Sequence, residues 1–423
     1  MIAFRNPLFD GQLRRTIGHG SYDGAELGEC LATASRVKDG DRESWYRGWM
    51  LLAERTFSAA ESSAAHGHRE SARRAFLRAS NYYRTAYVFH LEAPLPSLVH
   101  DAYGRHRVAF RRATAEMIPS IEQVTIPFED TTLPGYFCAA DETRGPLIIS
   151  VGGYDSTAEE CFFWNGAAAL AHGYHALIFD GPGQGELLIE RSIHFRSDWE
   201  KVISAVIDLA VRRDNVDVSK IILIGESWGG YLAPRAAAYD HRVALCVLDP
   251  AQIGLFRVML SRLPLPAGLK SQLPHGPRWL VMLLRALMAR MARQPTGGWA
   301  LRRGMLTHGK ASAWDYFVDA ARYEQENIIG NISCPTLVCD AENDDISAYS
   351  KTFFELLRCA KDYLRFASDE GAGEHCISGN RSLFHERVFD WLDVKIAQTS
   401  ADIPSPPKSW NTSFPPKVRK VKL

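Results

Sequence analysis

The sequence has no surplus of charge of either sign, because Lys+Arg and Asp+Glu each total 49 among its 423 residues. Binding to nucleic acid depends largely on neutralising phosphates, so we expect no nucleic-acid partner. No apolar run approaches the roughly 18 residues that a membrane span needs, and the best one, Trp279 to Leu284, stops at Arg285. The N-terminus lacks the apolar segment of a signal peptide, so we predict a soluble, cytoplasmic protein without a membrane span.

Disulfide and metal-binding patterns are also missing. The eight cysteines are scattered without a C-x-x-C, and several lie in apolar runs, which predicts reduced, buried thiols. His66-x-His68 has no further ligands nearby, and Gly181-x-Gly183-x-Gly185 has the wrong spacing for a dinucleotide site. The P-loop-like Gly304 to Lys310 is followed by Ala311 where Ser or Thr would hold magnesium. We therefore expect neither a metal nor a cofactor.

The pattern of apolar residues predicts an α/β protein with a mostly parallel sheet. Continuous apolar runs such as 147–151, 176–179 and 221–224 are typical of strands covered on both faces, and helical stretches such as 198–213 separate them. The chain begins with a predicted helical N-terminal domain (1–118), in which helical periodicity is clear from about residue 40. An α/β core follows in two parts (119–250 and 332–398), separated by a helical lid insertion without strand signal (251–331). The last segment is a basic tail (399–423) that we expect to be disordered. The final Val-Lys-Leu lacks the small first residue of a peroxisomal address.

The residues Gly225-Glu226-Ser227-Trp228-Gly229 match G-x-S-x-G. Alone the motif is weak, but here it follows the apolar strand 221–224 and precedes a helix, which is the context of a nucleophile elbow. The two glycines are needed because the serine sits in a strained conformation where side chains two residues away would collide with neighbouring elements. An ordinary Gly-rich turn is the alternative interpretation.

A nucleophilic Ser227 needs a base and an acid, which follow it along the chain in this topology. His375, in a loop after the last predicted strand, is favoured over His385, which lies in a helix. Asp344 is favoured as the acid because it lies in the loop after the strand 336–339, with Asp345 and Asp249 as the other candidates.

The oxyanion of acyl chemistry needs hydrogen-bond donors, which we assign to the backbone amides of Trp228 and Tyr154. Gly153 and Asp155, in the same Gly-Gly turn as Tyr154, are candidate substrate contacts. Tyr83 is a third candidate, from the helical region, where Tyr82 and His90 are alternatives and core packing explains most aromatic residues equally well.

These motifs together resemble the α/β-hydrolases, and in particular the branch with an N-terminal helical domain that includes the 2,6-dihydroxypseudooxynicotine hydrolase type and hydrolases of fungal heptaketide and polyketide–amino acid pathways. The resemblance covers about residues 40–396 and includes the segments 152–157, 180–186 and 225–231. It implies a Ser-Asp-His triad that cleaves esters, or carbon–carbon bonds beside a ketone, in bulky apolar or aromatic substrates. Acyl transfer or cyclisation by the same triad, and a non-catalytic binding module, are the alternatives. The sequence leaves open whether the chain forms a homodimer.

Overall fold

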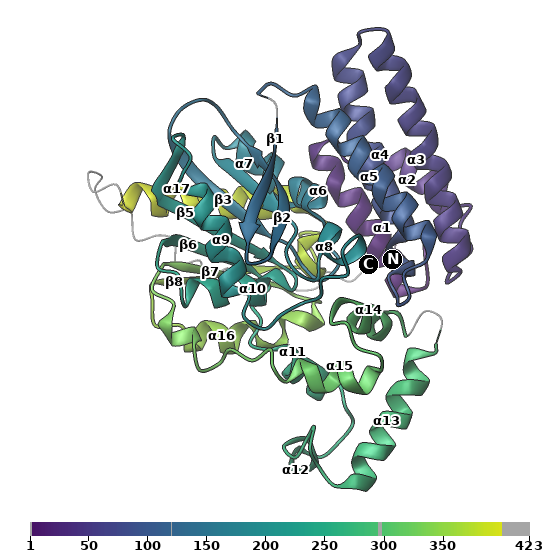
Figure 1. Cartoon of the computed structure of the whole chain (residues 1–423), viewed down its shortest axis with the longest axis vertical. Helices are drawn as coiled ribbons and strands as arrows, with labels where there is room; N and C mark the ends of the chain where they lie inside the picture. The colour runs from purple at the N-terminus through teal and green to yellow at the C-terminus, as the bar shows by residue number, and fades with distance from the viewer. Residues whose placement is uncertain (1, 120, 295–297, 400–423) are drawn as a thin grey trace, which may run out of the picture.

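The computed structural model describes residues 2–119, 121–294 and 298–399. Its centre is an eight-stranded sheet in the order β1-β2-β4-β3-β5-β6-β7-β8 (Figure 1). The first two strands pair antiparallel and the other six run parallel to one another. The bounds are β1 Glu122–Phe128, β2 Thr131–Cys138, β3 Gly145–Val151, β4 His175–Phe179, β5 Val216–Glu226, β6 Val243–Asp249, β7 Thr336–Ala341 and β8 Lys361–Phe366. The α/β class with a mostly parallel sheet is therefore confirmed.

Helices cover both faces of the sheet, which is why its central strands are continuously apolar. Side chains of one strand alternate between the faces, so Ile149 and Leu223 join one apolar core and Ile148 and Ile222 join the other. The first core lies under α9 (Glu200–Ala210) and α10 (Gly229–Ala237), and the second under α17 (Arg381–Thr399). The remaining short helices of the core are α6 Ala158–Cys161, α7 Ala167–Ala171, α8 Gly185–Ile189 and α16 Ser350–Leu356.

The N-terminal region is helical from its beginning. It contains α1 (Pro7–Gly18), α2 (Leu27–Ala34), α3 (Arg42–Ala65), α4 (Arg69–Tyr87) and α5 (Ser97–Ala115). The last three form a bundle beside the sheet (Figure 1). Two helices precede residue 40, where the helical periodicity becomes clear, and both are short, with 12 and 8 residues. Local signals start α1: the Asn6 side chain caps it and Pro7 occupies its first turn.

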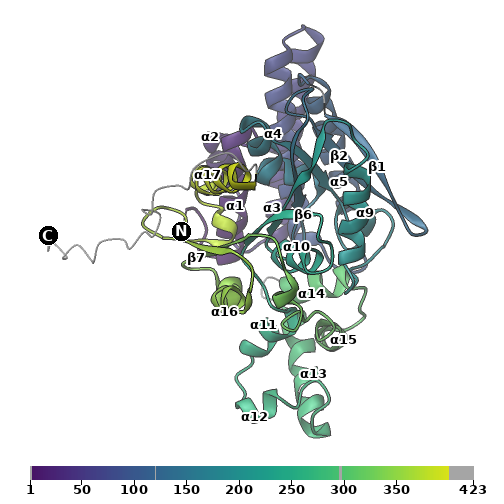
Figure 2. The same ribbon diagram turned by 90° about the vertical axis from the view of Figure 1, so that its left-hand side faces the viewer.

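Within the described residues, five α-helices and one short 3-10 helix (Ile329–Asn331) lie between β6 and β7. The α-helices are α11 (Leu255–Ser261), α12 (Ala267–Lys270), α13 (Arg278–Ala292), α14 (Trp299–Thr307) and α15 (Ala313–Ala320). In both views α12 and α13 extend away from the sheet, whereas α14 lies nearer the N-terminal helices (Figures 1 and 2). The Trp299 indole of α14 donates a hydrogen bond to the Val88 carbonyl at 3.0 Å. The insertion therefore contacts the N-terminal region.

The state of the cysteines and the character of the helices concern the predicted thiols and the predicted lack of a membrane span. All eight cysteines are free thiols and seven are buried. None of the described helices combines the length and the apolar character needed to cross a membrane. Residues 400–423, which make up nearly all of the predicted basic tail, lie outside the described part of the chain.

Candidate active site

Ser227 occupies the turn between β5 and α10 with φ = +55°, in the left-handed region that non-glycine residues rarely adopt. A Cβ on Gly225 would overlap the Gly229 carbonyl oxygen, and one on Gly229 would overlap the Val151 carbonyl oxygen. Both glycines are thus required by close backbone approaches. The turn leaves Ser227 partly exposed while its neighbours are buried.

Two loops at the same edge of the sheet bring His375 and Asp344 to this serine. His375 Nε2 lies 2.9 Å from Ser227 Oγ, and His375 Nδ1 lies 2.7 Å from Asp344 Oδ2. Asp344 directly follows β7 and His375 follows β8. The three side chains form one continuous hydrogen-bonded chain, although 148 residues separate Ser227 from His375.

Asp344 controls the charge of His375. Desolvation alone would lower the pKa of this imidazole, but the adjacent Asp344 carboxylate outweighs it and raises the pKa well above the ordinary 6.5. The carboxylate is itself buried and accepts a hydrogen bond from the Ile346 amide. It therefore stabilises the imidazolium and fixes the orientation of the ring.

The other candidates for acid and base are engaged elsewhere. The Asp249 carboxylate is buried against Arg381, with 3.3 Å between Oδ2 and Nη1. His385 Nε2 lies 2.6 Å from the Trp164 carbonyl, and Asp345 is exposed. In the described part of the chain, the side chains of these three residues form no hydrogen bond with the side chain of Ser227 or His375.

Arg381 of α17 is a buried residue that sequence reasoning missed. It bonds to Glu226, the residue before Ser227, at 2.5 Å, and to the carbonyl of Cys376, the residue after His375, at 2.9 Å. Burial raises the pKa of Asp249 to about 7 even though Arg381 opposes the shift. One guanidinium thus compensates two buried carboxylates and ties together the loops that carry Ser227 and His375.

The Gly152–Gly153 turn packs directly against the serine, since a Cβ on Gly153 would lie 2.7 Å from Ser227 Cβ. The Gln184 side-chain amide donates to the carbonyls of Gly152 and Gly153 at 2.7 and 2.9 Å. Because a trans peptide directs its N–H opposite to its C=O, the Tyr154 amide points away from Gln184. Within the described residues, neither this amide nor that of Trp228 donates to a protein acceptor. Both are free to bind an oxyanion.

The phenol of Tyr154 joins this turn to the insertion. Its hydroxyl lies within hydrogen-bond distance of His308 Nε2 and 3.0 Å from the Tyr316 hydroxyl, and His308 Nδ1 lies 2.9 Å from Asp319 Oδ2. Desolvation lowers the pKa of His308 despite Asp319, so the ring is neutral at pH 7. The neutral ring donates from Nδ1 to Asp319 and accepts from Tyr154. Sequence reasoning missed His308, Tyr316 and Asp319, because nothing in their own segment shows that the fold brings it to Tyr154.

Asp155, a candidate substrate contact from the sequence, forms two ion pairs in the structure. Its carboxylate lies 3.1 Å from Arg15 of α1 and 2.8 Å from Arg303 of α14, and its side chain is buried. Burial would raise the pKa of Asp155, but the two arginines outweigh it and hold the pKa well below its ordinary range. Both carboxylate oxygens link the turn to the N-terminal helix and the insertion, and the substrate contact expected of Asp155 stays a prediction.

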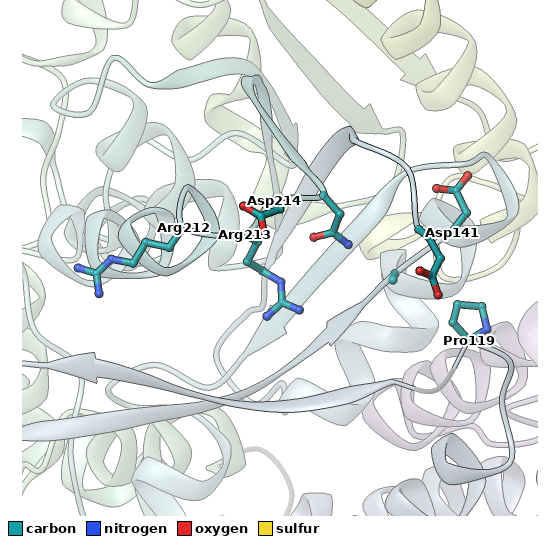
Figure 3. A pocket seen from close by; sticks show the side chains of 8 residues that line it. Pro119, Asp141, Arg212, Arg213 and Asp214 are labelled. Atoms are coloured by element: carbon teal, nitrogen blue, oxygen red, sulfur yellow. The ribbon is translucent and has the colours of Figure 1, made fainter.

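Tyr83 lies on α4 in the helical region. It lines a hollow of about 460 Å³ on the helical region, with Phe57, Arg105 and other residues of α3 and α5. A second hollow, of about 510 Å³, is lined by residues such as Asp141 and Arg213 (Figure 3). It lies where β3 and β5 begin, at the edge of the sheet opposite Ser227. Neither hollow is lined by a residue of the Ser227–His375–Asp344 chain, and Tyr83 as a substrate contact stays a prediction.

Among the described residues, no cluster of three or more His, Cys, Asp or Glu side chains could hold a metal ion. The polar side chains that join Ser227 are those of His375 and Asp344.

Comparison with known proteins defines the class. The model of the alpha/beta hydrolase family matches residues 150–378, and the chain belongs to this family. It is a hydrolase. Hydrolase LUC6 from Fusarium sp is 32% identical over 92% of this chain and 97% of its own length. The 20-hydroxy-prefusarin hydrolase FUS2 of Gibberella moniliformis is 32% identical over 93% of this chain and 98% of its own.

The solved structure of 2,6-dihydroxy-pseudo-oxynicotine hydrolase shares the fold. The two superpose with a TM-score of 0.72 and 22% sequence identity, over 90% of this chain and 96% of that one. The match therefore includes the N-terminal helices, and the predicted resemblance to this type of hydrolase is confirmed at the level of the fold.

Proposed function

We propose that the protein is a serine hydrolase in which Ser227 is the nucleophile, His375 the general base and Asp344 the acid that orients it. The observation that carries the proposal is the unbroken hydrogen-bonded chain Asp344–His375–Ser227, built on a serine with φ = +55°. A structural serine has no need of a left-handed backbone or of a histidine with a raised pKa.

The chemistry follows from these positions. His375 Nε2 takes the Ser227 proton as Oγ attacks a carbonyl carbon, and Asp344 stabilises the imidazolium that forms. The amides of Trp228 and Tyr154 bind the oxyanion of the tetrahedral intermediate. Its collapse breaks the bond to the leaving group, which takes the proton from His375 and departs as an alcohol, or as an enol when the bond is carbon–carbon. Water, deprotonated by His375, then releases the acid and regenerates Ser227.

We propose a bulky, largely apolar carbonyl compound of fungal polyketide-type secondary metabolism as substrate. The surroundings of Ser227 support an apolar ligand, because the rings of Tyr154 and Trp228 lie 5.5 Å apart and Phe195 lies 5.1 Å from Tyr154. The relatives support the pathway, since FUS2 is named for a 20-hydroxy-prefusarin substrate. The proposed triad and the two oxyanion donors suit the cleavage of an ester and of a carbon–carbon bond beside a ketone equally well.

The direct test is labelling with an alkyl fluorophosphonate followed by peptide mapping. We expect one adduct, on Ser227, and we expect its loss in Ser227→Ala and strong slowing in His375→Gln. A Ser227→Ala protein that still turned over p-nitrophenyl butyrate at the wild-type rate would refute the assignment. Absence of both labelling and turnover in a folded wild-type protein would favour the non-catalytic binding module.

Isotope analysis then separates hydrolysis from cyclisation or acyl transfer. In ¹⁸O-labelled water a hydrolase places one labelled oxygen in the carboxylic acid product, whereas ring closure by an internal nucleophile places none. The same assay on an ester and on a β-diketone would show which bond is cleaved.

A further inference from the structure

The part of the insertion farthest from the sheet presents an apolar surface to solvent. Five large apolar side chains of α13 are 40 to 70% exposed: Trp279, Met282, Leu283, Leu287 and Met291. They lie on a helix that extends beyond the rest of the molecule in both views (Figures 1 and 2). Scattered exposed apolar residues are ordinary, but five on one helix of 15 residues form a contiguous patch. We call these five residues the α13 patch.

The α13 patch is not part of the buried core of the insertion. An adjacent stripe of the helix, Leu280, Leu284 and Met288 at i, i+4 and i+8, is buried and joins a core with Trp314 and Phe317 of α15. This stripe anchors the helix to the insertion. The outward residues 279, 283 and 287 repeat the same spacing on the neighbouring face, so they are available to another surface.

The charge around the α13 patch is of one sign. The 65 residues from 250 to 314 contain ten Lys or Arg and no Asp or Glu, in a chain whose formal net charge is zero. Four of these ten pair with acidic residues outside the segment. The other six form no ion pair within the described residues: Arg262, Lys270, Arg278, Arg285, Arg290 and Arg293. Four of the six lie on or directly after α13.

We propose that α13 is an interfacial helix that docks the protein on an anionic lipid bilayer. Basic residues beside Trp, Leu and Met on one amphipathic helix suit a surface in which phosphate headgroups border acyl chains. A second copy of the chain fits less well, because a two-fold contact through α13 would bring two sets of unpaired arginines together. The helix would lie in the plane of the headgroups, with the α13 patch among the acyl chains. No part of this proposal depends on the triad.

The test is sedimentation of the full-length protein with vesicles of phosphatidylcholine, with and without phosphatidylserine. We expect binding to the phosphatidylserine vesicles that weakens with added salt, and little binding to phosphatidylcholine alone. The triple variant Trp279→Ser, Leu283→Ser, Leu287→Ser should bind about tenfold more weakly or worse, as should Arg278→Gln, Arg285→Gln, Arg290→Gln. Leu51→Ser on α3, where the leucine is 64% exposed, is the matched control and should bind like wild type.

Three results would overturn the proposal. The first is a wild-type protein that does not sediment with phosphatidylserine vesicles. The second concerns the variant Trp279→Ser, Leu283→Ser, Leu287→Ser, whose folding is checked by its thermal melt. If this variant binds vesicles like wild type, while the tail variant Lys417→Gln, Arg419→Gln, Lys420→Gln, Lys422→Gln loses binding, the tail and not α13 is the docking element. The third is a wild-type protein that is a dimer by analytical ultracentrifugation and does not bind lipid, together with a monomeric Trp279→Ser, Leu283→Ser, Leu287→Ser variant. That result would make the α13 patch a contact between copies.

Discussion

The hydroxyl of Tyr154 is hydrogen-bonded to Nε2 of His308, 154 residues further along the chain. The amide of Tyr154 is one of the two proposed oxyanion donors, so the insertion fixes a residue that would contact the reacting atoms through its backbone. Electrostatic stabilisation of an oxyanion depends on donors held in place before reaction. His308 is therefore a positioning residue.

The first prediction concerns this bond. His308→Leu and Tyr154→Phe should each lower kcat on p-nitrophenyl butyrate about tenfold, with a smaller change in KM, and the double variant should be no worse than either because the two residues act as a unit. His308→Gln, which retains a hydrogen-bonding side chain, should recover part of the rate. Effects that multiply in the double variant would show that the two side chains act independently.

A second prediction follows from the raised pKa of His375. The reaction needs the unprotonated imidazole, so kcat/KM should rise with pH along an acid limb whose apparent pKa lies above 6.5. Asp344→Asn removes the charge that raises this pKa and should shift the limb downward, while kcat falls roughly ten-thousandfold. The test is a pH–rate profile of both proteins, and an acid limb that stays in place in the variant would contradict the assigned cause.

The same shift has a consequence for stability. The folded-state pKa of His375 exceeds the unfolded value, so its pair with Asp344 stabilises the fold fully below about pH 6.5 and loses this effect as pH rises through the folded-state pKa. Urea unfolding at several pH values should show Asp344→Asn losing more stability, relative to wild type, on the acid side. A difference that does not vary with pH would exclude this linkage.

The third prediction concerns Arg381. Arg381→Met leaves Glu226 and Asp249 buried without a counter-charge and should reduce the free energy of unfolding by about 3 to 5 kcal/mol. Arg105→Met, on an exposed pair with Glu54 and Asp101, is the matched control and should change it by less than about 1 kcal/mol. Denaturant unfolding measures both. Equal losses in the two variants would contradict the role given to Arg381.

The fourth prediction tests the turn at Ser227. Gly229→Ala forces a Cβ onto the Val151 carbonyl, so it should destabilise the protein by about 1 to 3 kcal/mol and abolish phosphonate labelling. Gly11→Ala, in α1, where no other atom lies within 4 Å of the place that a Cβ would take, should be neutral or stabilising by about 0.5 to 1 kcal/mol. Normal labelling of a stable Gly229→Ala protein would show that the close approach is not required.

The strands and the proposed triad could be predicted because each depends on a strong local constraint. Strand β4 is buried at every position, and its residues 176–179 form a continuous apolar run. The G-x-S-x-G turn needs glycines at fixed positions, and the topology then restricts His375 and Asp344 to the loops after the last two strands. These constraints are visible in a single sequence.

The supporting contacts could not be predicted, because they join segments far apart in the chain. Arg381 resembles any helical surface arginine until the fold places it between Glu226 and Asp249. Asp155 looks like a loop carboxylate near substrate until Arg15 and Arg303 are found on either side. Long-range ion pairs leave no periodic pattern.

The double ion pair of Asp155 restricts how the chain can be shortened or recombined. A chain that began at residue 40, where the helical periodicity becomes clear, would lack Arg15 and leave the turn beside Ser227 with half of its counter-charge. An exchange of N-terminal helices between relatives would likewise keep the ion pair of Asp155 only if the new helices carried an arginine at the position of Arg15. The first helix, far from Ser227 in sequence, therefore has to match the α/β core at this ion pair.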